Sequence, residues 1–308
     1  MKRQGCGSEG TGGRLFALAV AVTTSACALP FRPVGVGQPF RVIAHRGASG
    51  HAPENTLPAF RRALELGAFE VELDVQLSRD DVLVLFHDRT LDRKTDGSGK
   101  VREHDAVTLR EMEIGSWFDQ EHGEVAQRYA GTALTTLREL FAELGDRLYY
   151  HIEIKALEEA IPRLVLELVR EFRLANRVTI TSFSWAQVSR FHTLAPRIPV
   201  CLLIDDADDL YEALSSNPDR SEADRPPLQR LQRDLIDRAW RAGFDQVAVA
   251  ARDLSPEIVA HAHTRGLEIR AWGIKSRADM VRATRLGTNG MTINWPERLL
   301  QLIADQRS

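Results

Sequence analysis

The chain has 308 residues, which is enough for one large domain or two of ordinary size. Hydrophobic residues make up 44% and charged residues 27% of it, a composition that excludes an intrinsically disordered protein. The formal net charge is -3 and no segment is dense in Lys and Arg, so the sequence lacks the basic surface that a nucleic-acid partner needs. Its three cysteines, Cys6, Cys27 and Cys201, lie far apart and indicate neither a disulfide framework nor a zinc site.

The N-terminal segment 1–30 has the pattern of an export signal. Basic residues within 2–14 precede the apolar run 15–22, which is shorter than the roughly 20 residues that a membrane-spanning helix needs. We therefore expect an exported protein, either periplasmic, anchored to a membrane or secreted. The alternative is a disordered N-terminus on a cytosolic protein.

The end of this segment allows two kinds of processing. Residues 23–27 resemble the end of a bacterial lipoprotein signal, in which the cysteine, here Cys27, is lipidated and attaches the protein to the membrane. Thr24 departs from that pattern, because an aliphatic residue is usual at its position. Cleavage near Ala26 or Ala28 would instead release a soluble protein.

From residue 40 onward, short apolar runs alternate with helical patterns. The apolar runs predict strands at 40–44, 69–75, 82–86, 148–154, 178–182, 199–204, 247–250, 268–272 and 290–293. Amphipathic patterns predict helices at 59–66, 137–144, 157–172, 185–194, 228–242, 256–265 and 277–286. The first helix is expected to be capped by Asn55 or Thr56 and to stop at Gly67.

The repeated strand and helix order predicts a parallel sheet. About eight such units favour a closed TIM-type (β/α)8 barrel spanning 38–308 as one catalytic domain. No glycine-rich turn of a nucleotide-binding type follows the first strand, which argues against an open nucleotide-binding sheet. Only 76–81 separate the second and third strands, so we expect an irregular, hairpin-like second unit. The polar stretch at about 89–133 predicts an insertion after the third strand.

Charged side chains concentrate at the ends of the predicted strands, where barrel enzymes build their sites. They are His45 and Arg46 after the first strand, Glu72 and Asp74 on the second, His87 and Asp88 after the third, and Glu153 and Lys155 on the fourth. Glu72 and Asp74 are two residues apart and therefore share a face of their strand. Buried acids at such a position require a cation nearby.

The acids and cations predict a site for a metal ion and an anionic substrate. Glu72, Asp74 and Glu153 offer only carboxylate oxygens, which suit a divalent cation, Ca²⁺ or Mg²⁺. Arg46 and Lys155 beside such an ion would neutralise a phosphoryl group as negative charge develops on it. The expected substrate is therefore a small-molecule phosphodiester.

Two histidines provide the proton transfers that phosphodiester cleavage needs. We expect one of His45 and His87 to take a proton from the nucleophile and the other to give one to the leaving alkoxide, because His titrates near neutral pH. His151 shares the face of Glu153 one layer deeper, and is expected to be a hydrogen-bonded core histidine.

Taken in series, the motifs resemble the glycerophosphodiester phosphodiesterase family, within the PLC-like phosphodiesterase superfamily. The motifs are His45-Arg46-Gly47, Pro53-Glu54-Asn55-Thr56, Glu72-Leu73-Asp74-Val75, His87-Asp88 and Ile152-Glu153-Ile154-Lys155. The resemblance implies metal-dependent hydrolysis of glycerophosphodiesters to glycerol 3-phosphate and an alcohol. It implies the same residue roles: two histidines as acid and base, three carboxylates as metal ligands, and Arg46 and Lys155 on the phosphate.

Residues next to these motifs have open roles. Glu54, Asn55 and Asp88 are candidates for residues that contact the metal ligands or the histidines without binding the metal or the substrate themselves. Glu54 could instead favour the start of the following helix, and Asp88 could orient His87 or cap a turn. Phe183 and Trp272 are either barrel packing or a wall of the substrate site.

The resemblance weakens toward the C-terminus, and other activities stay open. Gly273-Ile274-Lys275 replaces a polar segment of the family, and Asn294 stands where an acidic residue is usual, so we expect the difference to affect the substrate pocket. A lysophospholipase D-like or phosphoinositide phospholipase C-like activity would need an apolar entrance. An inactive exported binding protein is an alternative of another class, against which the retained histidines and carboxylates argue. The sequence indicates no oligomeric state.

Overall fold

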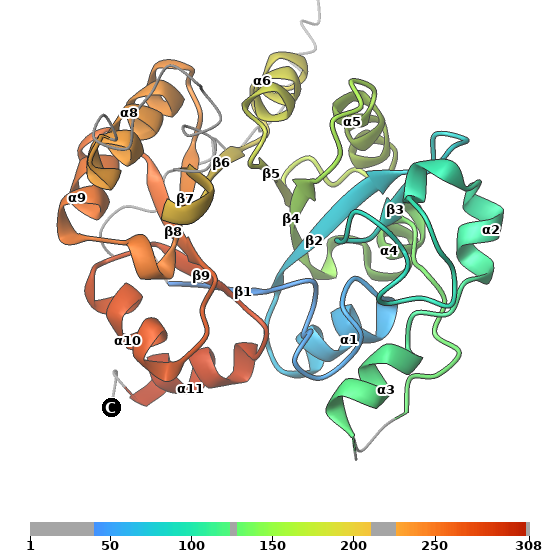
Figure 1. Cartoon of the computed structure of the whole chain (residues 1–308). Helices are drawn as coiled ribbons and strands as arrows, with labels where there is room; N and C mark the ends of the chain where they lie inside the picture. Colours follow the sequence, from blue (N-terminus) through green and yellow to red (C-terminus); the bar gives the residue numbers. More distant parts are fainter. Residues whose placement is uncertain (1–39, 124–127, 211–225, 306–308) are drawn as a thin grey trace, which may run out of the picture. The chain divides into compact units, whose positions relative to one another are not determined.

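The computed structural model describes residues 40–123, 128–210 and 226–305, so the expected signal and Cys27 lie outside them. The strands are β1 (Arg41–Ala44), β2 (Glu70–Leu77), β3 (Leu83–Leu85), β4 (Tyr149–Ile154), β5 (Val178–Ser182), β6 (Val200–Ile204), β7 (Gln246–Ala250), β8 (Glu268–Trp272) and β9 (Gly290–Ile293). They form one sheet in the order β1-β9-β8-β7-β6-β5-β4-β2-β3, which a further pairing of β1 with β2 closes. All pairings except that of β3 are parallel, which confirms the predicted TIM-type barrel (Figure 1).

The irregular second unit is confirmed as a hairpin. β3 runs antiparallel to β2, with Val75 opposite Leu85. β1 pairs with β2 only at its start, through Ile43 opposite Glu70 and Ala44 opposite Val71, so β3 takes over the same edge of β2 beyond the end of β1. His87 therefore follows the antiparallel strand of this hairpin. The five residues 78–82 between β2 and β3 allow only a reversal of direction, so the chain folds back along β2.

The helices lie outside the barrel. They are α1 (Leu57–Glu65), α2 (Ala106–Glu111), α3 (Ser116–His122), α4 (Leu137–Leu144), α5 (Ile161–Glu171), α6 (Trp185–Leu194), α8 (Leu228–Arg241), α9 (Pro256–Thr264), α10 (Arg277–Arg285) and α11 (Pro296–Asp305). Helix α5 begins later than predicted, because Pro162 occupies its first turn, where a missing N–H costs nothing. Sequence reasoning missed α11, although Pro296 at its start and buried Leu299 and Leu302 are helix signals.

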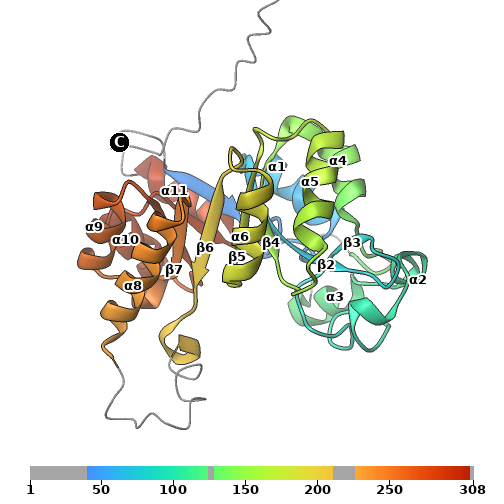
Figure 2. The ribbon, with the colours of Figure 1, turned by 90° about the horizontal axis from the view of Figure 1, so that it is seen from above.

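The chain between β3 and α4 carries α2, α3 and the short 3-10 helix Val101–Glu103. Figure 2 shows α2 and α3 near β3, at the opposite end of the structure from α8, α9 and α10. A small apolar cluster packs this segment on β3, with Leu91 and Leu109 against Val84 and Phe86. The Tyr129 hydroxyl donates to the backbone oxygen of His51 at 3.0 Å. The segment thereby braces the loop between β1 and α1.

The inside of the barrel holds a buried charge network. The His151 Nε2–H donates to Glu70 Oε2 at 2.8 Å, and Arg270 Nη1 donates to His151 Nδ1 at 3.1 Å. Arg41 lies 3.3 Å from Glu70 Oε2 and 3.9 Å from Glu268 Oε2. Burial and the Arg270 charge lower the pKa of His151 to about 3, so this ring is neutral and its Nδ1 accepts. In the part of the chain that the structure describes, no helix is long and apolar enough to cross a bilayer.

Candidate active site

A cavity of about 320 Å³ opens at the carboxyl ends of the barrel strands. Its lining includes most residues that the sequence singled out, namely His45, Arg46, Glu72, His87, Glu153, Lys155, Phe183 and Trp272, together with Thr181, Leu203, Arg270, Ile274, Lys275, Thr292 and Asn294. Asp74 is fully buried next to Glu72 and Glu153. The fold thus gathers the predicted histidines, carboxylates and cations in one place.

A tight turn after β1 positions the first histidine and arginine. Arg46 and Gly47 both have left-handed backbone conformations, with φ of 52° and 79°. A Cβ on Gly47 would lie 2.6 Å from the carbonyl carbon of Ala59, so only glycine allows α1 to pack this close. The Arg46 N–H donates to Glu72 Oε2 at 3.1 Å, which ties the turn to β2.

Three buried carboxylates form the centre of the site. Ligand oxygens of Glu72, Asp74 and Glu153 lie within 4.8 Å of one another. Glu72 Oε1 and Asp74 Oδ1 are buried without a hydrogen-bond partner among the described residues. Burial and the two neighbouring carboxylates raise the pKa of Glu72 well above its usual value. Unpartnered, mutually repelling oxygens of this kind fit a hard divalent cation.

Two cations border the carboxylates. Arg46 Nε lies 3.1 Å from Asp74 Oδ2, and Arg46 Nη1 donates to Glu54 Oε1 at 2.9 Å. Lys155 Nζ donates to Glu153 Oε1 at 2.8 Å and lies 3.9 Å from Asp74 Oδ1. Burial acts to raise the pKa of Asp74, but Arg46 and Lys155 outweigh it and hold that pKa below its usual value. Asp74 therefore stays ionised.

Asn55 holds a metal-ligand candidate and does not cap the helix. Its Nδ2 donates to Asp74 Oδ2 at 2.8 Å, and its Oδ1 accepts from the Asp74 backbone N–H at 3.1 Å. The N-cap of α1 is Thr56, whose hydroxyl donates to the Pro53 oxygen instead of accepting from the helix. The expectation that either side chain caps α1 is wrong, because both are already engaged elsewhere.

Glu54 connects the site to the segment between β3 and α4. It accepts from Arg46 and pairs with Lys94 Nζ at 2.5 Å. Lys94 is buried, lies 3.8 Å from Asp88 Oδ1 and sits over the Trp117 ring at 4.9 Å. Sequence reasoning missed Lys94, since a single lysine within a polar segment carries no signal of burial. Glu54 therefore pairs with two cations, Arg46 and Lys94, in addition to preceding the start of α1.

His45 is oriented by a residue from the far end of the chain. Asn294 Oδ1 accepts from His45 Nδ1 at 2.6 Å, and His45 Nε2 lies 3.8 Å from Glu72 Oε2. Burial and the Arg46 charge lower the pKa of His45 to about 4. Asn294, whose departure from the family was expected to affect the substrate pocket, lines the cavity and contacts this histidine directly.

His87 has a carboxylate as its partner. Its Nδ1 lies 2.9 Å from Asp88 Oδ1. Arg93 Nε donates to Asp88 Oδ2 at 2.9 Å on the outer side. Burial acts to raise the pKa of Asp88, but its bond with His87 and the charges of Lys94 and Arg93 lower it to about 2. Asp88 is therefore ionised and orients His87.

Two aromatic rings form one wall of the cavity. Phe183 and Trp272 pack edge to face with ring centroids 5.4 Å apart. Trp272 Nε1 donates to the Ile204 backbone oxygen at 3.3 Å, and Lys155 Nζ lies 5.6 Å from the centre of the Phe183 ring. These contacts hold the rings rigid, and both rings line the cavity. Phe183 and Trp272 therefore pack against each other within the barrel and also form part of the cavity wall.

The glycerophosphoryl diester phosphodiesterase family matches residues 45–298 of the chain. The chain belongs to this family. A glycerophosphodiester phosphodiesterase of Caldanaerobacter subterraneus subsp. tengcongensis is 30% identical over 270 residues, covering 85% of this chain and 97% of the relative. One of Bacillus subtilis (strain 168) is 30% identical over 267 residues, covering 83% of each chain.

The barrel of this family member also matches solved structures. An Oleispira antarctica phosphodiesterase, solved in complex with the product sn-glycerol-3-phosphate, has a TM-score of 0.71 with 23% identity, covering 86% of this chain and 96% of that one. At this identity the match supports the fold. The motifs on which the sequence resemblance rested, from His45 to Lys155, lie within the matched family region.

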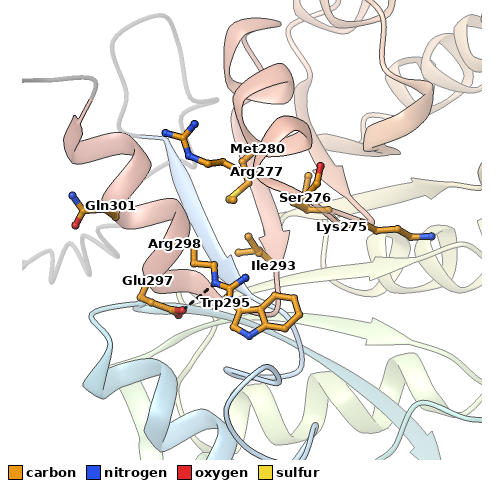
Figure 3. Close-up of a pocket in the computed structure, with 10 residues that line it drawn as sticks. Lys275, Ser276, Arg277, Met280, Ile293, Trp295, Glu297, Arg298 and Gln301 are labelled. Atoms are coloured by element: carbon orange, nitrogen blue, oxygen red, sulfur yellow. Dashed lines mark ion pairs between the residues drawn. The ribbon is translucent and has the colours of Figure 1, made fainter. Parts of the chain in front are cut away.

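A second, wider hollow of about 610 Å³ adjoins the cavity. Figure 3 shows it between α10 and α11, with Lys275 at one side and Gln301 at the other. Ile274 and Lys275 line both the hollow and the cavity. The two hollows therefore meet at these two residues, and Met280, Ile293 and Trp295 give the wider one a partly apolar lining.

Proposed function

We propose that this protein hydrolyses glycerophosphodiesters to glycerol 3-phosphate and an alcohol, with a divalent cation as cofactor. The observation that carries the proposal is the gathering of His45, His87 and three buried carboxylates around one cavity of a chain in this family. The names of the two relatives and the product complex of the solved structure support the same substrate class.

Glu72, Asp74 and Glu153 would hold the cation, Ca²⁺ or Mg²⁺. A second group of potential ligands, Glu54, His87 and Asp88, is less suited. Its carboxylates pair with Arg46, Lys94 and Arg93, whereas Glu72 and Asp74 each keep a buried oxygen without a hydrogen-bond partner among the described residues. When bound, the ion supplies positive charge that stabilises the negative charge on the phosphoryl oxygens. It would also relieve the repulsion within the carboxylate group.

Lys155 and Arg46 bind the phosphate in this proposal. Both side chains line the cavity and keep their charge, because neighbouring carboxylates raise the pKa of each against the effect of burial. The phosphodiester brings one negative charge into a site where three carboxylates already lie, so fixed cations are needed to hold it.

The histidines have different partners, and we assign them different roles. His45 donates its Nδ1–H to an amide oxygen, which leaves Nε2 of the neutral ring free to take the proton of the nucleophile. His87 pairs with the ionised carboxylate of Asp88, which orients the ring. Because His45 takes the role of base, we assign His87 as the acid that protonates the leaving alkoxide when the bond from phosphorus to the alcohol oxygen breaks.

The direct test is turnover by the purified protein. Glycerophosphocholine and lysophosphatidylcholine are supplied side by side, with Ca²⁺ or Mg²⁺, and glycerol 3-phosphate and choline are measured. We expect glycerol 3-phosphate from the first substrate. Exclusive cleavage of the lysophospholipid would replace the proposal with a lysophospholipase D-like activity. Binding of both without turnover would favour the binding-protein alternative.

We also propose that residues 1–30 direct export, with Cys27 as a lipid attachment site. The support is the short apolar run 15–22 and the small residues before Cys27. A phosphodiesterase outside the cytosol would meet diesters that are released from lipids at the cell surface.

A further inference from the structure

The floor of the cavity carries a cation outside the family motifs. Arg270 of β8 lines the cavity, although only 1% of its surface is exposed. Its Nη1 donates to His151, but Nε and Nη2 have no hydrogen-bond partner among the described residues. Because a guanidinium only donates, and buried donors are normally paired, this side chain lacks acceptors that a ligand could supply.

The network beneath Arg270 fixes its position. The neutral His151 ring donates its one N–H to Glu70, so its other nitrogen can only accept a hydrogen bond from Arg270. Arg41 lies close to the two nearby acids, Glu70 and Glu268. The Cys201 thiol lies beside the guanidinium, but sulfur is a weak acceptor. Arg270 is thus a hydrogen-bond donor whose position is fixed by its bond to His151.

The two sides of the cavity suit the two arms of a phosphodiester. Arg270 and two hydroxyl side chains, Thr181 and Thr292, are polar residues of the lining. Ile274 and Lys275 belong to the same lining and also line the wider hollow of Figure 3. The glycerol arm is the same in every glycerophosphodiester, whereas the alcohol arm varies. The buried, fixed donors of Arg270 fit the constant arm, and the wider hollow beyond Ile274 and Lys275 fits the variable one.

We propose that Arg270 donates hydrogen bonds to the hydroxyl oxygens of the glycerol arm and thereby selects phosphodiesters that contain glycerol. The inference rests on the proposed function and names a specificity-determining residue for it. A site built to hydrogen-bond a hydroxyl rejects an analogue without one, because its donors are then left unpaired.

The test compares two ligands that differ only in hydroxyl groups. Glycerol 3-phosphate and propyl phosphate are titrated by calorimetry, with Ca²⁺ present, into the wild-type protein and Arg270→Met. We expect the wild type to prefer glycerol 3-phosphate by about 10- to 10²-fold. In Arg270→Met this preference should vanish, while binding of propyl phosphate changes by less than about threefold.

Arg41→Met is the matched control, since Arg41 belongs to the same network and does not appear in the cavity lining. It should keep the preference. Should Arg270→Met not fold, Arg270→Lys keeps the charge without the planar fork and should show a reduced preference. Three results would overturn the inference. They are an equal loss of affinity for both ligands in Arg270→Met, an unchanged preference in that variant, and the absence of a preference in the wild type. Turnover of glycerophosphocholine by the wild type tests the proposed function separately.

Discussion

Asn294 Oδ1 lies 2.6 Å from Nδ1 of His45, although 249 positions separate the two residues in the chain. This bond selects the form of the neutral ring that carries its hydrogen on Nδ1. Nε2, the nitrogen on the side of Glu72, is then unprotonated. A residue after the last barrel strand therefore determines which nitrogen of His45 carries the hydrogen.

Removing this acceptor should weaken catalysis without removing the histidine. We expect Asn294→Ala to lower kcat by up to about 10²-fold with little change in KM, because the ring loses its orientation. Asn294→Asp keeps an acceptor at the same place and should restore most of the rate. Steady-state kinetics with glycerophosphocholine measures both. If the kcat of Asn294→Ala lies within about twofold of the wild-type value, this hydrogen bond has no catalytic role.

The two histidines should each be indispensable for turnover. His45→Ala and His87→Ala should each reduce kcat by about 10² to 10⁴-fold, the usual contribution of a general acid or base. Calcium binding should persist in both, because neither residue is among the three carboxylates. His263→Ala removes an exposed histidine of α9 and serves as the control. Near-normal rates in either active-site variant would remove that residue from the mechanism.

Metal removal should abolish activity and lower stability. A chelator should stop turnover, and Ca²⁺ or Mg²⁺ at about 100 times its Kd should stabilise the fold by about 2.7 kcal/mol, since it binds only the folded site. Thermal unfolding and activity are measured on the same samples. Glu72→Gln should reduce the metal-dependent stabilisation, whereas Glu171→Gln, at an exposed surface pair, should not. Full activity in excess chelator would contradict metal dependence.

One acidic residue after β6 should make stability depend on pH. Burial and the nearby charges of Asp209 and Asp206 raise the pKa of Asp205 to about 6. A carboxyl whose pKa is raised by folding lowers stability as pH rises from its usual value to the raised one. Asp205→Asn should therefore raise the melting temperature at pH 8 and change it little near pH 4. The effect should shrink in high salt, which screens repulsion between partly exposed carboxylates. An equal shift at both pH values would indicate a cause other than this charge.

The location of the protein should depend on Cys27. Acyl chains on this residue would add about 0.8 kcal/mol of membrane affinity per buried CH₂. In an organism that processes lipoproteins, the wild type should partition into detergent, and Cys27→Ser should stay aqueous and active, because the site begins only at His45. A wild type found wholly in the aqueous phase would favour simple secretion.

Local sequence patterns were sufficient for most of the barrel. The strands 268–272 and 290–293 and the helix 185–194 occur at the predicted residues. Their boundaries depend on signals within a few positions, such as Ser184, whose side chain accepts from the Gln187 N–H at the start of α6. The grouping of acids and cations from several strand ends could also be predicted, because the carboxyl ends of parallel barrel strands all lie at the same mouth of the barrel.

Only the tertiary structure decided how these residues are partnered. Lys94 and Arg270 reach the site from segments whose local patterns carry no sign of it. Asn294 was expected to affect the substrate pocket, but its bond to His45 was not predicted. Asn55 bonds to Asp74 rather than to the helix that follows it. Each of these contacts joins residues far apart in the chain. Their energies depend on burial and on the partners that the closed barrel brings together, which no periodicity along the sequence encodes.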